Sequence, residues 1–540
     1  MCKNPKTFIQ IHYHNRPGGV TSVMYRYADT FLSSSKNSPI HNCIICHQTR
    51  TGTQEDNPTN IVDVPACDYR RFTNRSQFDK AANELFLIIA QIIKNAPKPA
   101  IIIAHNLTIG KNCALSTAFA RCAEVAYNAD PLSTDVRFFV VIHDFAENCR
   151  TDMMQEIKTV ESFEHTFRTD RYCPLPNIQY VTINKFSATI LKKAQIKPRV
   201  LPNPLNDEKS ITATGSPEVK TRCIDALSRF ARLNNYCFDH SLPILYSPGR
   251  TIGRKNIAES LLIAMTAAPC NLLLGPDPTS SHDRTFALAC KAFCAQQNLP
   301  VIFDAPHAHY LLKSTQVTNS EMVEMLLGYA RAALTTAVSE GFGYVFYEPW
   351  FFGTPAVGRI PLGIDPPISD VSPDSFYKKL LIPLEWIDYR HLIDQTYDSF
   401  CRCFGLTVSK NGFESQFLKS HCTKESIDFG VVDKSQQLTV LAKCAQDNAS
   451  KETIIHRNRV FFETLNGLLT TPIEFYADKI ETTRNRLLVN FGTHRFLSNF
   501  EDVFLSERRT TRQPDSQQYE PQNILTHFAD PAQFNIHLTP

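Results

Sequence analysis

The chain of 540 residues is longer than one hydrophobic core usually supports, which predicts two or more domains. Its hydrophobic content of 43% and charged content of 20% are those of a globular protein. The 56 Lys and Arg against 53 Asp and Glu leave a net charge of +3. This balance gives no whole-chain reason to expect nucleic acid or an anionic membrane as partner, so any anion binding must be local.

The sequence predicts a protein that stays in the cytoplasm. The first residues, 1–7, are polar and lack the apolar core of a secretory signal. The most apolar stretch, 85–93, is too short to span a bilayer and carries a Gln. We therefore expect no transmembrane segment, while peripheral membrane contact is left open.

The 17 cysteines are scattered through the chain and predict no metal site. The nearest approach to a ligand cluster is the segment 41–47, which reads His-Asn-Cys-Ile-Ile-Cys-His. A structural zinc site needs converging deprotonated ligands and usually a second ligand pair downstream. Because these thiols lie within an apolar run, we expect a buried strand with reduced cysteines. Cys401 and Cys403 receive the same interpretation.

The first third of the chain alternates short apolar runs with helical patterns. This alternation predicts a parallel sheet covered on both faces, here a Rossmann-like domain over residues 1–205. Residues 206–240 are polar and irregular, which predicts a linker and entry segment with one helix at 223–232. The expected strands of the first domain are 7–12, 41–46, 100–104, 136–142, 179–183 and 198–201, and its clearest helices are 20–32 and 81–94.

A second alternation predicts another Rossmann-like domain over residues 241–434. Beyond it, long helical patterns at 451–469 and 473–488 predict a helical extension over 435–506. The tail 507–540 is rich in Arg, Thr, Gln and Pro, and we expect it to be mobile or draped over the surface. The fold class is therefore α/β, with two doubly wound domains and a helical C-terminal extension. The expected strands of the second domain are 243–246, 271–274, 300–303, 332–335 and 355–357, and its helices are 256–267, 284–297, 321–330 and 343–352.

The segment 339–348 carries the strongest functional signal, Ser-Glu-Gly-Phe-Gly-Tyr-Val-Phe-Tyr-Glu. An apolar strand delivers the chain to Glu340, and the glycines that follow let backbone approach a ligand closely. We expect a helix to begin there, so that its free N–H groups face a phosphate. Glu348, inside that helix, would accept hydroxyl hydrogen bonds, as from a ribose. A strand-to-helix turn with solvated glutamates explains the segment equally well when it is taken alone.

The loop 247–255 is the second signal, because it follows the first strand of the second domain. Ligands of doubly wound sheets bind beyond the carboxyl ends of the strands. Arg250, as a planar fork, and Lys255, as a point charge, would there neutralise a diphosphate leaving group. Since cations are common in loops, this stretch alone is weak support.

Two further signals follow strands of the first domain. Gly18 and Gly19 resemble a phosphate-approach loop that opens a helix, although a Gly-Gly turn is more often only a turn. His143 ends a later strand, where an imidazole can hydrogen-bond a sugar hydroxyl or an acceptor. With Asp144 it fits a helix-capping pair equally well.

The remaining histidines are interpreted more simply. His105 and Asn106, at the end of the strand before, are expected to line the same cleft. His12 and His14 either line it too or are loop residues with satisfied hydrogen bonds. His307 and His309 are taken as structural.

Together these four signals resemble the retaining glycosyltransferases of the GT-B fold, specifically glycosyltransferase family four. The resemblance covers residues 8 to about 363, and its most specific part is 340–348, which matches that family's Glu-x7-Glu motif with Gly-Phe-Gly inside. The family's fold has two Rossmann-like domains that face each other across a cleft, and the resemblance implies a donor held in that cleft.

The resemblance also implies roles for the two cations of the loop 247–255 and for the glycines and the histidine of the first domain. Arg250 and Lys255 are similar to the family's Arg/Lys pair that holds the donor diphosphate. Gly18 and Gly19 are similar to its glycine loop, whose backbone approaches the phosphates. His143 is similar to its histidine near the transferred sugar.

For the segment after the strand, the resemblance implies contacts to the donor itself. Glu340 would lie against the sugar and Glu348 would bind the ribose. Gly341, Phe342 and Gly343 would offer backbone N–H groups to sugar and phosphate. The family uses no divalent metal, and the nucleotide sugar is a substrate, so neither a metal nor another cofactor is expected.

The chain departs from the family pattern in two places. After Gly363 it does not follow the family's short ending, and the long helical segment has no part in the motif set. The stretch 303–305, Phe-Asp-Ala, lacks a glycine often found there. The resemblance therefore assigns the donor side and leaves the acceptor side unassigned.

The hypothesis from sequence is a hexosyltransferase that moves a sugar from a nucleotide-diphosphate-sugar donor to an acceptor hydroxyl with retention, through Glu340, His143, Arg250 and Lys255. Two alternatives remain: a sugar-nucleotide epimerase or hydrolase on the same fold, and a non-catalytic scaffold that binds the nucleotide sugar. A P-loop nucleotide hydrolase is disfavoured because no G-x-x-x-x-G-K-[ST] loop is present. Spacing does not give the donor base, the sugar or the acceptor.

Overall fold

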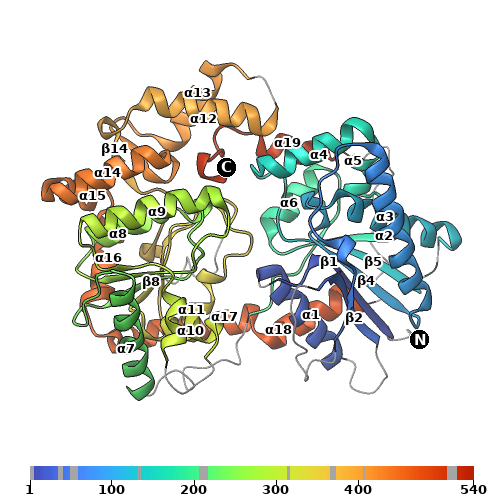
Figure 1. Cartoon of the computed structure of the whole chain (residues 1–540), viewed down its shortest axis with the longest axis horizontal. Helices are drawn as coiled ribbons and strands as arrows, with labels where there is room; N and C mark the ends of the chain where they lie inside the picture. Colours follow the sequence, from blue (N-terminus) through green and yellow to red (C-terminus); the bar gives the residue numbers. More distant parts are fainter. Residues whose placement is uncertain are drawn as a thin grey trace. The chain divides into compact units, whose positions relative to one another are not determined.

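The computed structural model describes residues 5–16, 18–34, 41–48, 59–131, 133, 135–205, 217–312, 317–364, 373–405, 408–506 and 520–539. The chain divides into two compact units (Figure 1). Unit 1 comprises Met1–Pro204 and Thr493–Asp530, and unit 2 comprises Leu205–Gly492 and Pro531–Pro540. The chain therefore passes from one unit to the other three times.

Unit 1 is built on a seven-stranded parallel sheet in the order β3-β2-β1-β4-β5-β6-β7. Every residue of β4 is buried, as expected for a strand covered on both faces. The strand order reverses between β1 and β4, and doubly wound sheets bind ligands at such a reversal. The strands are β1 (Thr7–His14), β2 (His41–His47), β3 (Asn60–Asp63), β4 (Ala100–His105), β5 (Val136–Ile142), β6 (Ile178–Thr182) and β7 (Arg199–Val200).

Helices cover both faces of this sheet. Because connections between parallel strands are right-handed, the outward and return directions of the strand order place α1 on one face and α2 and α3 on the other. α2 and α3 pack side by side (Figure 1). α2 follows its N-cap Asn74 and buries Phe78, Leu85 and Ile89 at helical spacing. The helices are α1 (Gly19–Ser34), α2 (Arg75–Asn95), α3 (Cys113–Ala129), α4 (Thr151–Phe163), α5 (Phe167–Arg171), α6 (Lys185–Lys193), α18 (Thr493–Phe500) and α19 (Gln522–Phe528).

Aromatic packing holds the late helix α18 in unit 1. The Phe500 ring lies against Phe8 of β1 and Tyr27 of α1, with centroid distances of 5.8 and 5.5 Å. Phe496 lies 5.6 Å from Tyr27. Each fully buried side chain of this size stabilises the fold by roughly 1.5–3 kcal/mol. The end of the expected helical extension therefore completes the core of the first domain.

Unit 2 carries a six-stranded parallel sheet in the order β10-β9-β8-β11-β12-β13. Its strand order reverses between β8 and β11. A separate antiparallel pair, β14 with β15, follows in the chain. The strands are β8 (Ile244–Ser247), β9 (Asn271–Leu274), β10 (Val301–Ile302), β11 (Ala332–Thr335), β12 (Ala356–Arg359), β13 (Phe376–Tyr377), β14 (Leu381–Pro383) and β15 (Ser426–Asp428).

The helix α7 belongs to the core of unit 2 and not to a linker. Its Leu227 and Phe230 pack in one cluster with Leu326 of α10 and Ile302 of β10. The expected linker residues 206–216 lie outside the described residues. Among the described residues, no helix has the length and apolar character needed to cross a bilayer. The helices are α7 (Pro217–Leu233), α8 (Ile257–Thr266), α9 (Ser281–Gln296), α10 (Asn319–Tyr329), α11 (Glu348–Phe351), α12 (Tyr389–Phe404), α13 (Lys410–His421), α14 (Lys434–Gln446), α15 (Asn448–Arg457), α16 (Arg459–Thr470) and α17 (Ala477–Phe491).

The helix expected over 343–352 does not form as one element. The chain makes a short 3₁₀ turn, η6 (Tyr344–Phe346), and only then the four-residue α11. Pro349 is the physical reason, since proline has no N–H with which to continue a helix from the preceding turn but is well accommodated in the first turn of a new one. Glu348 therefore begins a helix where the sequence placed it one or two turns inside one.

The C-terminal region is distributed over both units. The helix expected over 451–469 is interrupted at Asn458, whose side chain bonds the backbone of Leu381 in β14 through both of its polar atoms. In the tail, residues 507–519 lie outside the described residues. The described part is packed: α19 contacts α6, and Phe534 is fully buried. Residues 520–530 thus pack as part of unit 1, and residues 531–539 as part of unit 2.

Candidate functional site

The two sequence signals of the second domain meet at the strand reversal of the unit-2 sheet. The loop 248–256 follows β8, and the segment 336–343 follows β11. β8 and β11 are hydrogen-bonded neighbours and parallel, so their carboxyl ends lie at one edge. This edge, at the reversal, is where doubly wound sheets hold ligands.

Glu340 and Lys255 form an ion pair at this edge. Lys255 Nζ contacts Glu340 Oε1, and Arg254 Nη1 lies 3.4 Å from Glu340 Oε2. Arg254 Nη1 also donates to the Ser339 carbonyl at 3.1 Å. The Glu340 side chain is 8% exposed, whereas those of Lys255 and Arg254 are 21% and 34% exposed. The carboxylate is therefore enclosed, while both cations still reach solvent.

The charges of this cluster set the state of the carboxylate. Burial acts to raise the pKa of Glu340, but Lys255 and then Arg254 outweigh it and hold that pKa below its ordinary value. Burial lowers the pKa of Lys255, although Glu340 opposes that shift. Glu340 is thus ionised at neutral pH. With two cations around one carboxylate, the cluster is net positive and suits an anionic ligand.

Hydrogen bonds to backbone carbonyls join the two loops. Thr336 Oγ1 lies 2.8 Å from the Lys255 carbonyl and 3.1 Å from the Asn256 carbonyl, so its one proton is shared between them. Val338 N donates to the Arg254 carbonyl at 2.9 Å. Asn256 adopts the left-handed backbone conformation, φ +49°, which Asn tolerates better than most residues. The cations are therefore presented by a loop with fixed backbone.

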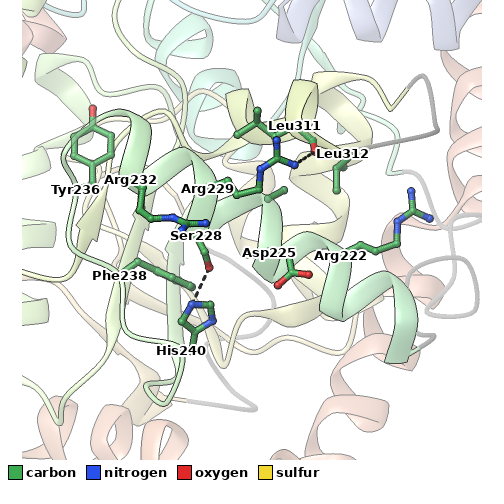
Figure 2. A pocket seen from close by; sticks show the side chains of 12 residues that line it. Arg222, Asp225, Ser228, Arg229, Arg232, Tyr236, Phe238, His240, Leu311 and Leu312 are labelled. Atoms are coloured by element: carbon green, nitrogen blue, oxygen red, sulfur yellow. Dashed lines mark hydrogen bonds between the residues drawn. The ribbon is translucent and has the colours of Figure 1, made fainter.

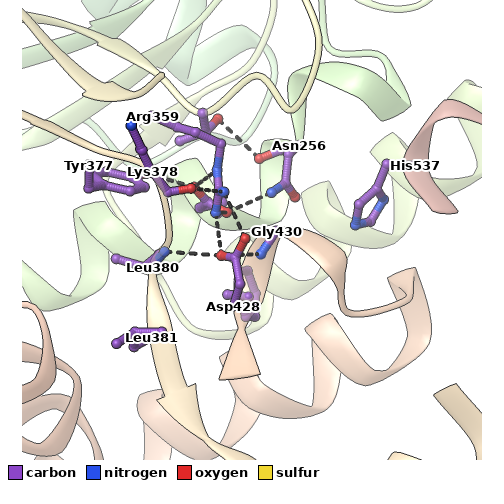
Figure 3. A network of polar contacts seen from close by, with 12 residues as sticks. Asn256, Arg359, Tyr377, Lys378, Leu380, Leu381, Asp428, Gly430 and His537 are labelled. Atoms are coloured by element: carbon purple, nitrogen blue, oxygen red, sulfur yellow. Dashed lines mark hydrogen bonds and ion pairs between the residues drawn. The ribbon is translucent and has the colours of Figure 1, made fainter. Parts of the chain in front are cut away.

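A buried ionic network holds the C-terminal end of the loop 248–256, where α8 begins (Figure 3). Arg359 Nη2 lies 2.7 Å from both Glu259 Oε2 and Asp428 Oδ1. All three side chains are at most 5% exposed. Asn256 Nδ2 donates to Glu259 Oε2 at 2.7 Å, and Tyr377 donates to Glu259 Oε1 at 2.6 Å. Because Asn256 directly follows Lys255, the network fixes the point at which the cation loop joins α8.

The structure does not bring Arg250 to Glu340. Arg250 is exposed, and its Nη1 lies 3.4 Å from Thr279 Oγ1. Arg254, which sequence reasoning missed, lies beside the carboxylate, in the 3₁₀ turn η4 (Gly253–Lys255). Its only sequence signal is its place next to Lys255.

The other residues of the motif follow Glu340 in a compact turn. Phe342 is buried and stacks on Tyr347 with a centroid distance of 4.8 Å. Gly343 has φ +78°, and a Cβ there would lie 2.7 Å from the Phe346 ring, so only glycine fits. Gly341 precedes this turn and Glu348 follows it.

In unit 1, His143 lies at the end of a buried chain of side chains. Gln10 Nε2 donates to the Met24 carbonyl at 2.9 Å, so its Oε1 faces His105 Nε2, also at 2.9 Å. His105 Nδ1 in turn lies 3.2 Å from His143 Nε2. Both imidazoles are buried.

The hydrogen bonds from Gln10 through His105 to His143 determine the tautomers of the two histidines. Gln10 Oε1 can only accept, so His105 carries its proton on Nε2 and accepts at Nδ1. His143 must then donate from Nε2, which leaves its Nδ1 as an acceptor. Burial lowers the pKa of His143 to about 4 and, helped by nearby histidines, that of His105 well below 6.5. Both rings are neutral at pH 7.

Gly18 lies between β1 and α1, after the first strand as the sequence predicts. Gly19 is the first residue of α1, and a Cβ there would meet nothing within 4 Å. Pro17 lies outside the described residues. Asp144, after His143, forms an ion pair with Arg150. His307 and His309 lie on the 3₁₀ helix η5 (Ala305–Leu311), where their rings contact each other.

The cysteines of the segment 41–47 lie in β2. Cys43 and Cys46 are fully buried, and burial raises the pKa of each thiol to about 12, so both stay protonated. In the part of the chain that the structure describes, no group of three or more His, Cys, Asp or Glu side chains is placed to hold a metal ion.

A hollow of about 630 Å³ lies along α7 and is not part of the site at the strand reversal. Its lining comes from α7, residues 236–240 and residues 311–312. Figure 2 shows Arg229 turned to the Leu311 carbonyl, 3.4 Å away, and Ser228 hydrogen-bonded to His240. None of these residues belongs to the loops after β8 or β11.

Comparison with known proteins gives one curated relative. The chain is 22% identical over 469 residues to the mannosylglucosyl-3-phosphoglycerate synthase of Petrotoga mobilis, and the match covers 85% of each chain. No family model matches the sequence.

Several solved structures are similar at low identity. The N-terminal domain of Candida albicans trehalose-6-phosphate phosphatase is 12% identical with a TM-score of 0.49, covering 93% of this chain and 97% of its own. The UDP-forming trehalose-phosphate synthase of Burkholderia xenovorans is 12% identical with a TM-score of 0.47, covering 93% and 98%. The sucrose-phosphate synthase of Thermosynechococcus elongatus is 12% identical with a TM-score of 0.43, covering 90% and 99%. Identities this low transfer no activity to the chain.

Proposed function

We propose that this protein is a glycosyltransferase that binds a nucleotide-diphosphate sugar at the strand reversal of the unit-2 sheet and transfers the sugar to a hydroxyl acceptor. The observation that supports this most strongly is the Glu340 carboxylate held between Lys255 and Arg254 at that edge. A diphosphate needs cations that are fixed in place and accessible, and both cations have these properties.

The ion pair also suggests how the site works. An incoming diphosphate competes with Glu340 for Lys255, so the carboxylate becomes available to accept hydrogen bonds from the sugar. When the bond between the anomeric carbon and the phosphate oxygen breaks, Lys255 and Arg254 stabilise the negative charge that develops on the leaving group. The acceptor oxygen bonds the anomeric carbon in its place, and the hydroxyl proton passes to the departing diphosphate. Retention of the anomeric configuration, and roles for Glu348 and Arg250 at the donor, rest on the family resemblance.

His143 is proposed as a neutral group that accepts a hydroxyl hydrogen bond through Nδ1. Its Nε2 proton is already donated to His105, so only the acceptor side is available. Gly18 and Gly19 are proposed to lie near the donor phosphates. No metal and no cofactor is required, because the two cations supply the positive charge.

Transfer is favoured over the rival activities by the name of the relative. A mannosylglucosyl-3-phosphoglycerate synthase builds a glycoside, whereas an epimerase or hydrolase would not. Incubation with a labelled nucleotide sugar separates the three: a transferase labels an acceptor, an epimerase changes the sugar without one, and a hydrolase releases it.

Calorimetric titration of the full chain with uridine, guanosine and adenosine diphosphates tests donor binding directly. We expect one of them to bind, and Lys255→Met to weaken it by about tenfold or more, since a desolvated charge-assisted contact is lost. The matched control is Lys220→Met, because Lys220 is an exposed lysine on α7. Failure of all three diphosphates to bind, or equal binding by Lys255→Met, would exclude the proposal.

A further inference from the structure

Two cations lie over one tyrosine ring in unit 1, and a third, Arg150, is paired with Asp144 after β5. Lys111 Nζ lies 4.1 Å from the Tyr69 ring centroid and donates to the Tyr69 hydroxyl at 2.8 Å. The Arg16 guanidinium lies over the same ring at 5.6 Å. The charge of Arg150 contributes to lowering the pKa of Lys111. We call Arg16, Lys111 and Arg150 the Tyr69 cation cluster.

The cluster lies at the strand reversal of the unit-1 sheet. Arg16 follows β1 and Lys111 follows β4, the two neighbours between which the strand order turns. Arg150 is held by Asp144, which follows β5. Ligands of doubly wound sheets bind at this edge. Tyr69 exposes 45% of its surface, so the ring and the cations on it are reachable from solution.

The charges of the cluster are not balanced. Arg16 is paired with Asp68 and Arg150 with Asp144, which accounts for two of the three cations. Among the described residues, no carboxylate lies within ion-pair distance of Lys111, and its ammonium contacts the Tyr69 hydroxyl and ring. One positive charge is therefore left over in a partly buried site.

Burial and the neighbouring cations disfavour the charged form of Lys111, and a bound anion would offset this cost. Burial first, and then the charges of Arg150 and Arg16, lower the pKa of Lys111 to about 8. His12 and His14 also face this edge and are neutral at pH 7, because burial lowers their pKa values to about 3 and about 4. An anion placed among the cations would relieve the repulsion and raise the pKa of Lys111.

We propose that the Tyr69 cation cluster binds an anionic group, a phosphate or a carboxylate, of the acceptor substrate. This rests on the proposed function in one respect only, the identity of the ligand as an acceptor. Lys111 supplies the uncompensated charge, the Tyr69 hydroxyl orients its ammonium, and Arg16 and Arg150 shape the positive field. The acceptor is thereby assigned to the class of anionic hydroxyl compounds.

Titration with inorganic phosphate and with acetate tests whether the Tyr69 cation cluster binds an anion. The full chain carrying Lys255→Met is used, so that anion binding at unit 2 does not interfere. We expect at least one anion to bind at low ionic strength, and a second substitution, Lys111→Met, to weaken it about tenfold or more. Lys80→Met is the matched control, because Lys80 is an exposed lysine on α2. Neither anion binding, or equal binding after Lys111→Met, overturns the proposal.

Proton uptake on anion binding distinguishes a Lys111 that contacts the anion from a Lys111 with a purely structural role. A structural role would produce no uptake. Above pH 8, binding should take up protons, because the anion raises the pKa of a partly deprotonated lysine. Calorimetry in two buffers of different ionisation enthalpy measures this uptake, which should vanish in Lys111→Met. If Lys111→Met does not fold, Tyr69→Phe, which removes the hydroxyl that holds the ammonium, should weaken the same binding. Anion binding without proton uptake overturns the assignment to Lys111.

Acceptor assays separate this inference from the proposed function. With a donor that binds, glycerol 3-phosphate should be glycosylated better than glycerol, and Lys111→Met should abolish that preference. A preference for glycerol refutes the anionic acceptor while the transferase assignment stands. Failure of every nucleoside diphosphate to bind refutes the transferase and leaves the phosphate titration valid.

Discussion

The Arg254 guanidinium lies 3.4 Å from the Glu340 carboxylate, on the oxygen that Lys255 does not contact. The two residues come from loops that follow neighbouring strands, and the backbone of one loop bonds the other through Val338 N and the Arg254 carbonyl. Arg254 is therefore fixed at both its backbone and its side chain. It can act on a ligand without first having to be ordered, which lowers the entropic cost of binding.

The first prediction separates Arg254 from Arg250. Arg254→Met should lower the transfer rate by about two orders of magnitude, as expected for loss of a fixed cation at a developing charge. Arg250→Met should have a smaller effect, because Arg250 is exposed and lies apart from Glu340. Steady-state rates with a saturating labelled donor measure both. Equal losses in the two variants would mean that donor binding rearranges the loop.

The second prediction concerns the buried network behind the cation loop. Arg359→Met should destabilise unit 2 by about 3–5 kcal/mol, because it leaves Glu259 and Asp428 as buried carboxylates without their cation. Urea unfolding measures the change. Arg390→Met, at an exposed site on α12, is the control and should stay within about 0.5 kcal/mol of the native chain. A small effect of Arg359→Met would show that the carboxylates are neutral when buried.

The third prediction concerns the tautomer of His143. Nitrogen-15 spectra of histidine-labelled protein at neutral pH should show His105 and His143 both protonated on Nε2, as the Gln10 amide requires. Gln10→Met should remove this preference, because it removes the acceptor, whereas Gln10→Glu should retain it. A proton on His143 Nδ1 in the native chain would contradict the order of donors and acceptors along this chain.

The fourth prediction is a pH dependence of stability. Burial lowers the pKa of His12 to about 3 and of His143 to about 4, from 6.5. Between pH 6.5 and about 4 the unfolded chain therefore binds more protons than the folded chain, so stability is complete above that range and falls as the pH decreases. Each such group contributes a slope of up to about 1.4 kcal/mol per pH unit.

Urea unfolding at about pH 7 and about pH 5 measures this slope. His12→Asn should reduce it, because Asn can still donate to the His105 carbonyl but does not titrate. His165→Asn is the control, since His165 is exposed on unit 1. A slope that His12→Asn leaves unchanged would assign the acid sensitivity to other groups.

Continuous apolar runs predicted much of the sheet architecture. The expected strands 136–142, 271–274 and 332–335 coincide with β5, β9 and β11, because strands buried on both faces have few polar residues to blur their limits. The prediction of one helix over 343–352 is wrong, because Pro349 lacks the N–H that a continuous helix would need there.

The site was predictable as a pair of loops but not as a set of contacts. Strand ends indicated where a ligand site was to be expected, and Glu340 and Lys255 do meet there. Which arginine joins them depends on loop backbone that has no periodicity, so Arg254 could not be told from Arg250. The anchoring by Arg359 joins residues 100 and 69 positions apart in the sequence, and no local pattern reports such a contact.

The route of the chain has a practical consequence for dissecting this molecule. Because the polypeptide returns to unit 1 at Thr493 and to unit 2 at Pro531, a cut after Pro204 does not release either unit whole. A fragment ending there would lack Phe500 and so expose the aromatic rings of Phe8 and Tyr27. We expect it to aggregate through this exposed hydrophobic patch. Separate expression of the halves therefore calls for grafting residues 493–530 back onto the first piece.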